Sequence, residues 1–170
     1  AVTSRTKAIM AVDLFGHPAD YDALKKIARR HKLLIIEDAA QAPGSSYKGR
    51  WTGTLGDIGV FSLNYHKHIH TGEGGMCVTD DDRLAQRLAL IRNHGENAVE
   101  GFGVEDLTNT FGFNLRLSEL AAAIGLAQLA DIDRHVTRRE RLAEDHVHWQ
   151  RRLEEHAANR QQPDEVPARD

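Results

Sequence analysis

Short apolar runs alternate with a helix-like segment in the first part of the chain. Residues 8–12 and 33–36 are continuous apolar runs of strand length, too uniformly apolar for strands with one face in water. Between them, Leu24, Ile27 and Ala28 recur at helical spacing in a basic segment. A strand, a helix and a second strand within about thirty residues predict a parallel sheet covered by helices.

Two further strands are predicted after a glycine-rich stretch. Residues 42–57 contain a proline and several glycines, and we interpret them as a loop. The apolar residues 58–62 and 75–79 predict the third and fourth strands. The acidic run 80–82 then offers an N-cap and favourable charges to a helix that we expect to end near residues 93–95.

The second half of the chain is predicted to be mainly helical. Residues 96–114 lack periodicity and are interpreted as a loop. From Ser118 onwards, an apolar face that includes Leu120 predicts a capped helix. A longer and weakly apolar helix is expected over residues 134–158, and it needs a partner that this chain does not supply.

Composition narrows the class of protein. A chain of 170 residues favours one domain, and its 22 basic and 25 acidic side chains, net charge −3, give no electrostatic basis for binding nucleic acid or an anionic membrane. No window approaches the roughly 18 apolar residues of a membrane span. The single cysteine, Cys77, lies in an apolar segment and is expected to be buried. We therefore expect a cytoplasmic protein with a small-molecule or protein partner.

An acid stands at the end of the second predicted strand. In an α/β sheet, ligands collect at the carboxyl ends of the parallel strands, where Asp38 and Ser62 both lie. A carboxylate there could keep a pyridine nitrogen protonated, and Asp38 is the candidate unless Glu37 points inward instead. Taken alone, the more frequent role for such an acid is a helix or turn cap.

Lys67 lies in a loop between Ser62 and the glycine-rich turn 71–75. Most lysines are solvated surface residues. A serine hydroxyl can bond a phosphate, however, and glycines let the backbone approach a bulky cofactor. A lysine with a carboxylate arriving from a neighbouring strand is what a pyridoxal phosphate (PLP) enzyme needs, because the lysine forms the Schiff base and the acid holds the ring nitrogen.

Histidines 66, 68 and 70 alternate and could ligate zinc if the segment were extended. No cysteine or carboxylate second shell is evident nearby, so polar lining is the favoured interpretation and no metal is predicted. The mixed charges of residues 138–145 are typical of a solvated helix face.

Five ordered motifs resemble the sugar-nucleotide aminotransferases of the DegT/DnrJ family. Their order and spacing match the family between about residues 7 and 138. The matching segments are residues 37–42, residues 56–62, Lys67 with residues 72–75, residues 92–95, and residues 112–129.

The resemblance implies an α/β architecture, the three-layer large domain of fold type I PLP-dependent transferases, with a mostly parallel sheet flanked by helices. The domain is expected to be incomplete here, in a fragment of a longer protein. Residues 1–130 would form part of the PLP-binding large domain. Residues 131–160 would form a long helix leading toward a missing carboxyl-terminal small domain, and residues 161–170 a polar tail. It also implies a homodimer with active sites at the subunit interface.

Roles follow from the resemblance, residue by residue. Lys67 would be the catalytic lysine that binds pyridoxal 5'-phosphate, and Asp38 the partner of its ring nitrogen. Gln41 would contact the ring and Ser62 the phosphate. Asn114 would reach the phosphate from the neighbouring subunit.

The implied activity is transfer of an amino group from an amino acid, expected to be glutamate, to a keto sugar linked to a nucleotide. This reaction belongs to amino sugar and polysaccharide biosynthesis. Three alternatives stay open: a cyclitol aminotransferase, a PLP-dependent sugar dehydratase of the same family, and a truncated scaffold without catalysis. In the dehydratases a histidine replaces the lysine, whereas counting from Ser62 places Lys67 at that position.

Two departures from the family pattern accompany the resemblance. Pro43 stands where many members have histidine, which leaves the cofactor ligands in place. The phosphate loop and the ring-stacking aromatic residue that the family places before this region are not in the chain, so it would carry only part of the cofactor cradle.

Overall fold

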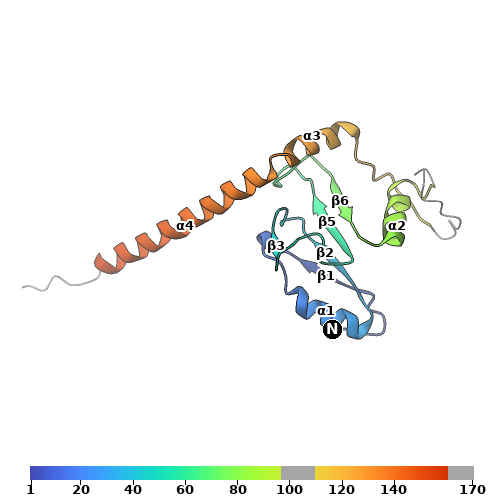
Figure 1. Ribbon diagram of the computed structural model, residues 1–170, viewed down its shortest axis with the longest axis horizontal. Coiled ribbons are helices and arrows are strands. Elements are labelled where there is room, and N and C mark those ends of the chain that lie inside the picture. Colours follow the sequence, from blue (N-terminus) through green and yellow to red (C-terminus); the bar gives the residue numbers. More distant parts are fainter. Residues whose placement is uncertain (97–109, 161–170) are drawn as a thin grey trace, which may run out of the picture. The chain divides into compact units, whose positions relative to one another are not determined.

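The computed structural model describes residues 1–96 and 110–160 (Figure 1). A short 3-10 helix, η1 (Leu14–Gly16), accompanies the regular elements. These are, in chain order, β1 (Ala8–Val12), α1 (Tyr21–His31), β2 (Leu34–Asp38), β3 (Ser46–Tyr47), β4 (Arg50–Trp51), β5 (Ile58–Ser62), β6 (Gly75–Val78), α2 (Asp82–Arg92), α3 (Glu119–Leu129) and α4 (Ile132–Arg160).

A four-stranded sheet of order β1-β2-β5-β6 organises the first part of the chain. Strands β1, β2 and β5 are parallel, and β6 pairs antiparallel to β5. The register sets Val12 beside Asp38, and Ser62 beside Gly75. The carboxyl ends of β1, β2 and β5 and the start of β6 therefore share one border of the sheet, called here the carboxyl edge. The predicted α/β class with a mostly parallel sheet is confirmed.

Helix α1 packs against β1 and β2 and closes the core (Figure 1). It begins where the Asp20 side chain accepts from the Ala23 N–H at 3.1 Å, and it ends at Lys32, whose φ of 53° is left-handed. Five buried residues form the core: Ala11, Tyr21, Ala28, Ile35 and Leu55. Burying a side chain of the size of Ile or Leu contributes about 1.5–3 kcal/mol, so this cluster anchors α1 on the sheet.

The stretch predicted as a loop contains a small hairpin. Strands β3 and β4 pair antiparallel, with Ser46 beside Trp51. Lys48 and Gly49 make the turn, with φ of 51° and 78°, and such a pair of positive φ values is what a tight hairpin turn requires. The loop predicted over residues 42–57 was wrong at these four residues, because two-residue strands leave no periodic pattern.

Cys77 is exposed, so its predicted burial was wrong. It lies on β6, an edge strand that pairs only with β5 among the strands of the described residues. Gly75 and Met76 of the same strand are exposed as well. An apolar run on an outer strand reads like one on a central strand, which explains the error.

The carboxyl-terminal helices are two rather than one continuous rod. Ser118 caps α3 as predicted, its Oγ accepting from the Ala121 N–H at 3.2 Å. Helix α3 ends at Leu129 and α4 begins at Ile132. A second compact unit of the chain starts at Asp133. The predicted domain plan, with a large-domain portion to residue 130 and a helix leading to a small domain, stays a prediction.

Within α4, His146 stacks on Trp149 with ring centroids 6.1 Å apart. Several of its apolar side chains are exposed, Leu142 and Trp149 among them. The expected polar tail, residues 161–170, lies outside the described residues, as does most of the loop expected over residues 96–114. In the part of the chain described, no helix is long and apolar enough to cross a membrane.

Candidate functional site

Four of the five predicted site residues belong to segments that leave the carboxyl edge. Asp38 ends β2 and Ser62 ends β5. Gln41 follows Asp38 by three positions. Lys67 lies in the connection from β5 to β6, which re-enters the sheet with Gly75 opposite Ser62. The topology therefore brings the segments that carry an amine, a carboxylate, an amide and a hydroxyl to one border of the sheet.

Glu37 and Asp38 point to opposite faces of β2, because side chains alternate along a strand. Glu37 is fully buried and accepts from the backbone N–H groups of Gly53, Leu55 and Gly56, the last two at 2.7 and 3.1 Å. Asp38 is half-buried, and its Oδ1 accepts from the Ala40 N–H at 3.1 Å. Glu37 is thus committed to holding the loop before β5, and the predicted role of Asp38 toward the ring nitrogen of a cofactor stays a prediction.

The loop held by Glu37 also passes very close to β5. A Cβ placed on Gly59 would lie 1.9 Å from the Gly53 carbonyl oxygen, and one on Gly56 would lie 2.7 Å from the Ile35 carbonyl oxygen. Contacts this short leave no space for any side chain. Glycine at these two positions lets the loop backbone reach the Glu37 carboxylate.

A second buried acid, Asp13, stands beside Glu37. Its Oδ1 accepts from the Tyr21 hydroxyl at 3.0 Å and from the Ala19 N–H at 3.0 Å. Burial raises the pKa of Glu37, the neighbouring Asp13 carboxyl adds to the increase, and the backbone donors oppose it. Burial and the charges of Glu37 and Asp13 likewise raise the pKa of the Tyr21 phenol. Sequence analysis missed this acid pair, although Asp13 directly follows β1 and so lies at the same edge of the sheet as Asp38 and Ser62.

Gln41 holds the turn that follows β1. Its Oε1 accepts from the Phe15 backbone N–H at 2.9 Å. Phe15 has a left-handed φ of 54° and is 87% exposed. An aromatic residue rarely adopts this backbone conformation unless its surroundings impose it. The predicted contact of Gln41 with a cofactor ring stays a prediction, and the structure adds that its oxygen fixes an exposed turn beside the carboxyl edge.

The loop that carries Lys67 is closed at its base. Leu63 donates its N–H to the Gly74 carbonyl at 2.8 Å and accepts from the Thr71 N–H at 2.9 Å. Asn64 Nδ2 donates to both carboxylate oxygens of Glu73, at 2.8 and 3.0 Å. The half-buried Lys67 donates its backbone N–H to the Asn64 carbonyl at 2.9 Å. Lys67 therefore sits in an ordered turn between fixed ends.

Ser62 keeps a hydrogen to donate. Its Oγ accepts from the Asn64 N–H at 3.3 Å, and a hydroxyl can accept and donate at once. The donor set at the carboxyl edge, an amine, a carboxylate and a hydroxyl, matches the aldehyde, ring nitrogen and phosphate of pyridoxal phosphate in chemical type.

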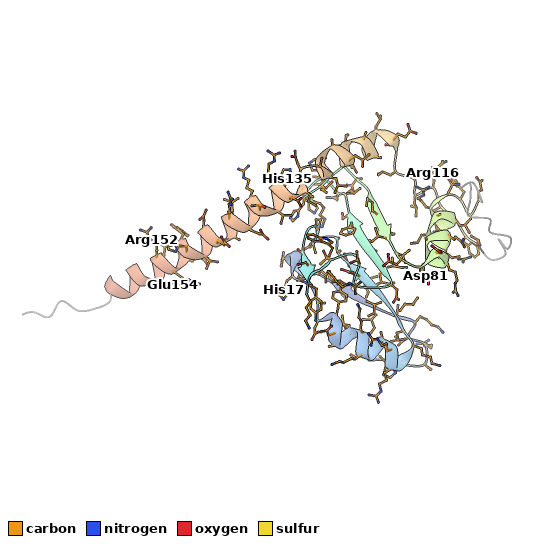
Figure 2. The ribbon with its side chains drawn as sticks, in the orientation of Figure 1. His17, Asp81, Arg116, His135, Arg152 and Glu154 are labelled. Carbon is orange, nitrogen blue, oxygen red and sulfur yellow. The ribbon has the colours of Figure 1, made fainter. Side chains whose placement is uncertain are left out.

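Asn114 lies apart from the other four. It forms an isolated antiparallel bridge with Asn93 at the end of α2, and its Oδ1 accepts from Arg116 Nε at 3.1 Å. Figure 2 shows Arg116 in the segment that leads into α3. Asn114 is exposed, and its role toward a neighbouring subunit stays a prediction.

The alternating histidines do not form a metal site in the described residues. His66 and His68 lie in turns and bends rather than in extended chain. No group of three His, Cys, Asp or Glu side chains that could hold a metal occurs in the parts of the chain described here.

Comparison with known proteins identifies the family. The sequence matches the profile of the DegT/DnrJ/EryC1/StrS aminotransferase family over residues 1–168. The chain belongs to this family. This match confirms the resemblance that was predicted from the sequence motifs.

Two curated relatives differ in the activity that their names state. GDP-perosamine synthase of Caulobacter vibrioides is 47% identical over 141 residues, which are 83% of this chain and 37% of the relative. L-glutamine:2-deoxy-scyllo-inosose aminotransferase of Streptoalloteichus tenebrarius is 39% identical over 150 residues, 85% of this chain and 35% of the relative. The chain spans less than half the length of these relatives.

A solved structure supports the fold. The GDP-4-keto-6-deoxy-D-mannose-3-dehydratase of E. coli, with bound hydrated PLP, superposes with a TM-score of 0.72 at 36% identity. The match covers 85% of this chain and 40% of that protein. The predicted fold, part of the large domain of fold type I PLP enzymes, is confirmed.

Proposed function

We propose that the protein containing this chain is a PLP-dependent aminotransferase that converts a keto sugar linked to a nucleotide into an amino sugar. The donor is an amino acid, expected to be glutamate. One observation carries the proposal: in a member of this aminotransferase family, the segments bearing Asp38, Ser62 and Lys67 all leave the carboxyl edge. The neighbouring acid, Glu37, is occupied by backbone donors.

The side chains have distinct tasks in this proposal. When bound, pyridoxal phosphate supplies an aldehyde that takes up an amino group and a ring that takes up electrons. Lys67 would hold the cofactor covalently, and its Nζ, once released, would carry the proton removed from the α carbon of the donor. The Asp38 carboxylate keeps the ring nitrogen protonated. Ser62 donates to the phosphate, and Gln41 contacts the ring.

The assembled enzyme is proposed to be a cytoplasmic homodimer acting in polysaccharide biosynthesis, with Asn114 reaching the phosphate of the partner subunit. Exposed apolar side chains on α3 support an interface: Leu120 is 81% and Leu126 67% exposed. The phosphate loop, the stacking aromatic residue and the small domain would come from segments beyond this chain.

A cyclitol aminotransferase is the second candidate, because a relative named for that activity is 39% identical. It would use the same four residues at the carboxyl edge. The dehydratase alternative is disfavoured because Lys67, not a histidine, stands five positions after Ser62. The third alternative, a truncated scaffold without catalysis, is tested by covalent binding of the cofactor.

The test is covalent binding of the cofactor. Full-length protein incubated with pyridoxal phosphate should show a near-visible absorbance that borohydride removes, and peptide mapping should then find the reduced cofactor on Lys67. Lys67→Ala should lose both signals, whereas Lys48→Ala, a surface control, should keep them. No adduct in the unaltered protein, or an adduct on another lysine, contradicts the proposal. Turnover of keto sugar nucleotides and of keto cyclitols then separates the two activities.

A further inference from the structure

Gln128, near the end of α3, grips the lysine loop with its side-chain amide. Its Nε2 donates to the His70 carbonyl at 2.6 Å, and its Oε1 accepts from the His70 backbone N–H at 3.1 Å. Both main-chain groups of one residue are therefore satisfied by one side chain. A third bond, from Nε2 to the Ile124 carbonyl at 3.3 Å, fixes the direction of the amide.

The helix also lies close to the loop backbone. A Cβ on Gly125 would lie 3.2 Å from Thr71 Cγ2. Three residues after Thr71, a Cβ on Gly74 would lie 2.9 Å from Cδ1 of Leu117, a residue just before the start of α3. The absence of side chains at these glycines allows the approach that lets the Gln128 amide reach the main chain of His70.

Lys67 lies in the chain between two attached points, the closed base of its loop at Leu63 and His70, which is bound by Gln128. The Leu63 backbone pairs with Gly74 and Thr71 and closes the base of the loop. The Gln128 amide fixes His70, three residues after Lys67. Removing the amide would take away an attachment of the segment that carries Lys67, while its closed base and the buried Ile69 would remain.

We propose that Gln128 is a positioning residue for Lys67: from α3 it holds the loop so that the lysine amine meets the cofactor aldehyde. This inference rests on the proposed function, because it takes Lys67 as the residue that binds pyridoxal phosphate. Misplacement of a reacting group by about 1 Å can cost about a hundredfold in rate.

Hydrogen exchange in full-length protein without added cofactor tests the grip itself. In Gln128→Met, which keeps the length of the side chain but no amide, the His70 N–H should exchange at least about tenfold faster. Gln128→Glu keeps an oxygen for the His70 N–H but loses the donor, so its exchange should be intermediate. Gln150→Met, the same change on the exposed surface of α4, is the matched control and should leave the His70 N–H unchanged.

The rate of covalent cofactor binding tests the positioning role. Stopped-flow absorbance should show pyridoxal phosphate bonding to Lys67 about tenfold or more slowly in Gln128→Met, and kcat should fall while KM for the amino donor stays within about twofold. A purely structural role would lower the unfolding temperature and leave these rates of the folded protein unchanged.

The outcomes separate the two proposals. Normal covalent binding in a folded Gln128→Met variant overturns the inference and leaves the proposed function standing. Failure of the unaltered protein to bond pyridoxal phosphate at Lys67 overturns the proposed function and the inference with it. If Gln128→Met does not fold, Gln128→Glu decides: an intermediate slowing supports the inference, and a rate equal to the unaltered protein refutes it.

Discussion

The two faces of β2 use neighbouring carboxylates in opposite ways. On one face, Glu37 is fully buried, accepts three backbone N–H groups and stands beside a second acid, Asp13. On the other, Asp38 is half-buried and accepts one backbone N–H, that of Ala40. Glu37 therefore stabilises the fold by binding the loop backbone, whereas Asp38 lies at the carboxyl edge, where the loop of Lys67 begins and ends.

This contrast shows why an acid at a strand end cannot be assigned from its position alone. A buried carboxylate that satisfies loop amides stabilises the fold, since leaving those donors unpaired would cost about 1–3 kcal/mol each. A carboxylate with few protein partners contributes little to folding but can serve a ligand. Isosteric amide substitutions should therefore have opposite effects on the two faces.

The largest effect is expected from Asp38→Asn. The amide keeps an oxygen for the Ala40 N–H but cannot stabilise a protonated ring nitrogen, so kcat of the full-length enzyme should fall about 10²–10⁴-fold. Urea unfolding should stay close to that of the unaltered protein. Steady-state kinetics beside the unfolding curve measure both, and an unchanged kcat would reject Asp38 as the ring partner.

Glu37→Gln should reverse the pattern. One of its oxygens becomes an amide nitrogen that meets backbone donors, which should lower the free energy of unfolding by about 2 kcal/mol. Cofactor binding in the folded protein should persist. The Asp38→Asn variant is the matched control, because it makes the same chemical change one residue along the strand; equal destabilisation of both would erase the proposed division between the faces.

The pH dependence of stability should carry the signature of Glu37. Its pKa is raised above the ordinary 4.5 by burial and by Asp13, so the folded state keeps a proton that the unfolded chain has lost. This contribution to stability is complete below pH 4.5 and is lost as the pH rises through the folded pKa, at up to about 1.4 kcal/mol per pH unit.

Urea titrations at a series of pH values measure this slope. The difference between the unaltered protein and Glu37→Gln isolates it, because the exposed acids titrate in both. If the difference in unfolding free energy between the two proteins does not change as the pH rises above 4.5, the pKa of Glu37 is not raised by folding.

Tyr21→Phe should have the smallest effect. It removes the hydroxyl that donates to Asp13 at 3.0 Å, while Asp13 keeps its bond from the Ala19 N–H. The loss should be about 1 kcal/mol of unfolding free energy, seen as a shift in the urea midpoint. A loss as large as that of Glu37→Gln would show that the phenol, rather than the loop amides, secures the buried acids.

Much of the fold could be predicted because it follows local patterns. Strand β5 has the predicted bounds, residues 58–62, since an apolar run stands between turn residues, and Ser118 caps α3 as its sequence indicates. The hairpin of β3 and β4 was missed because each strand has only two residues. Cys77 was misplaced because apolar runs on outer and central strands look alike.

In the candidate site, too, features that follow local sequence patterns could be predicted, and contacts between distant residues could not. Lys67, Asp38 and Ser62 could be selected because strand ends and glycine turns are visible in the sequence. The pairing of Asp13 with Glu37 and the grip of Gln128 on His70 could not, since each joins residues far apart in the chain and depends on distances that periodicity does not encode.

The contact between Gly53 and Gly59 has a consequence for how this sequence can vary. A methyl group at residue 59 would meet the Gly53 oxygen at 1.9 Å, so even alanine would push the loop away from the strand. No larger residue fits at position 59, and substitutions elsewhere cannot make room, because the two backbones themselves fill the space. Substitutions in this part of the chain are therefore expected at exposed positions such as Lys26 and not at position 59.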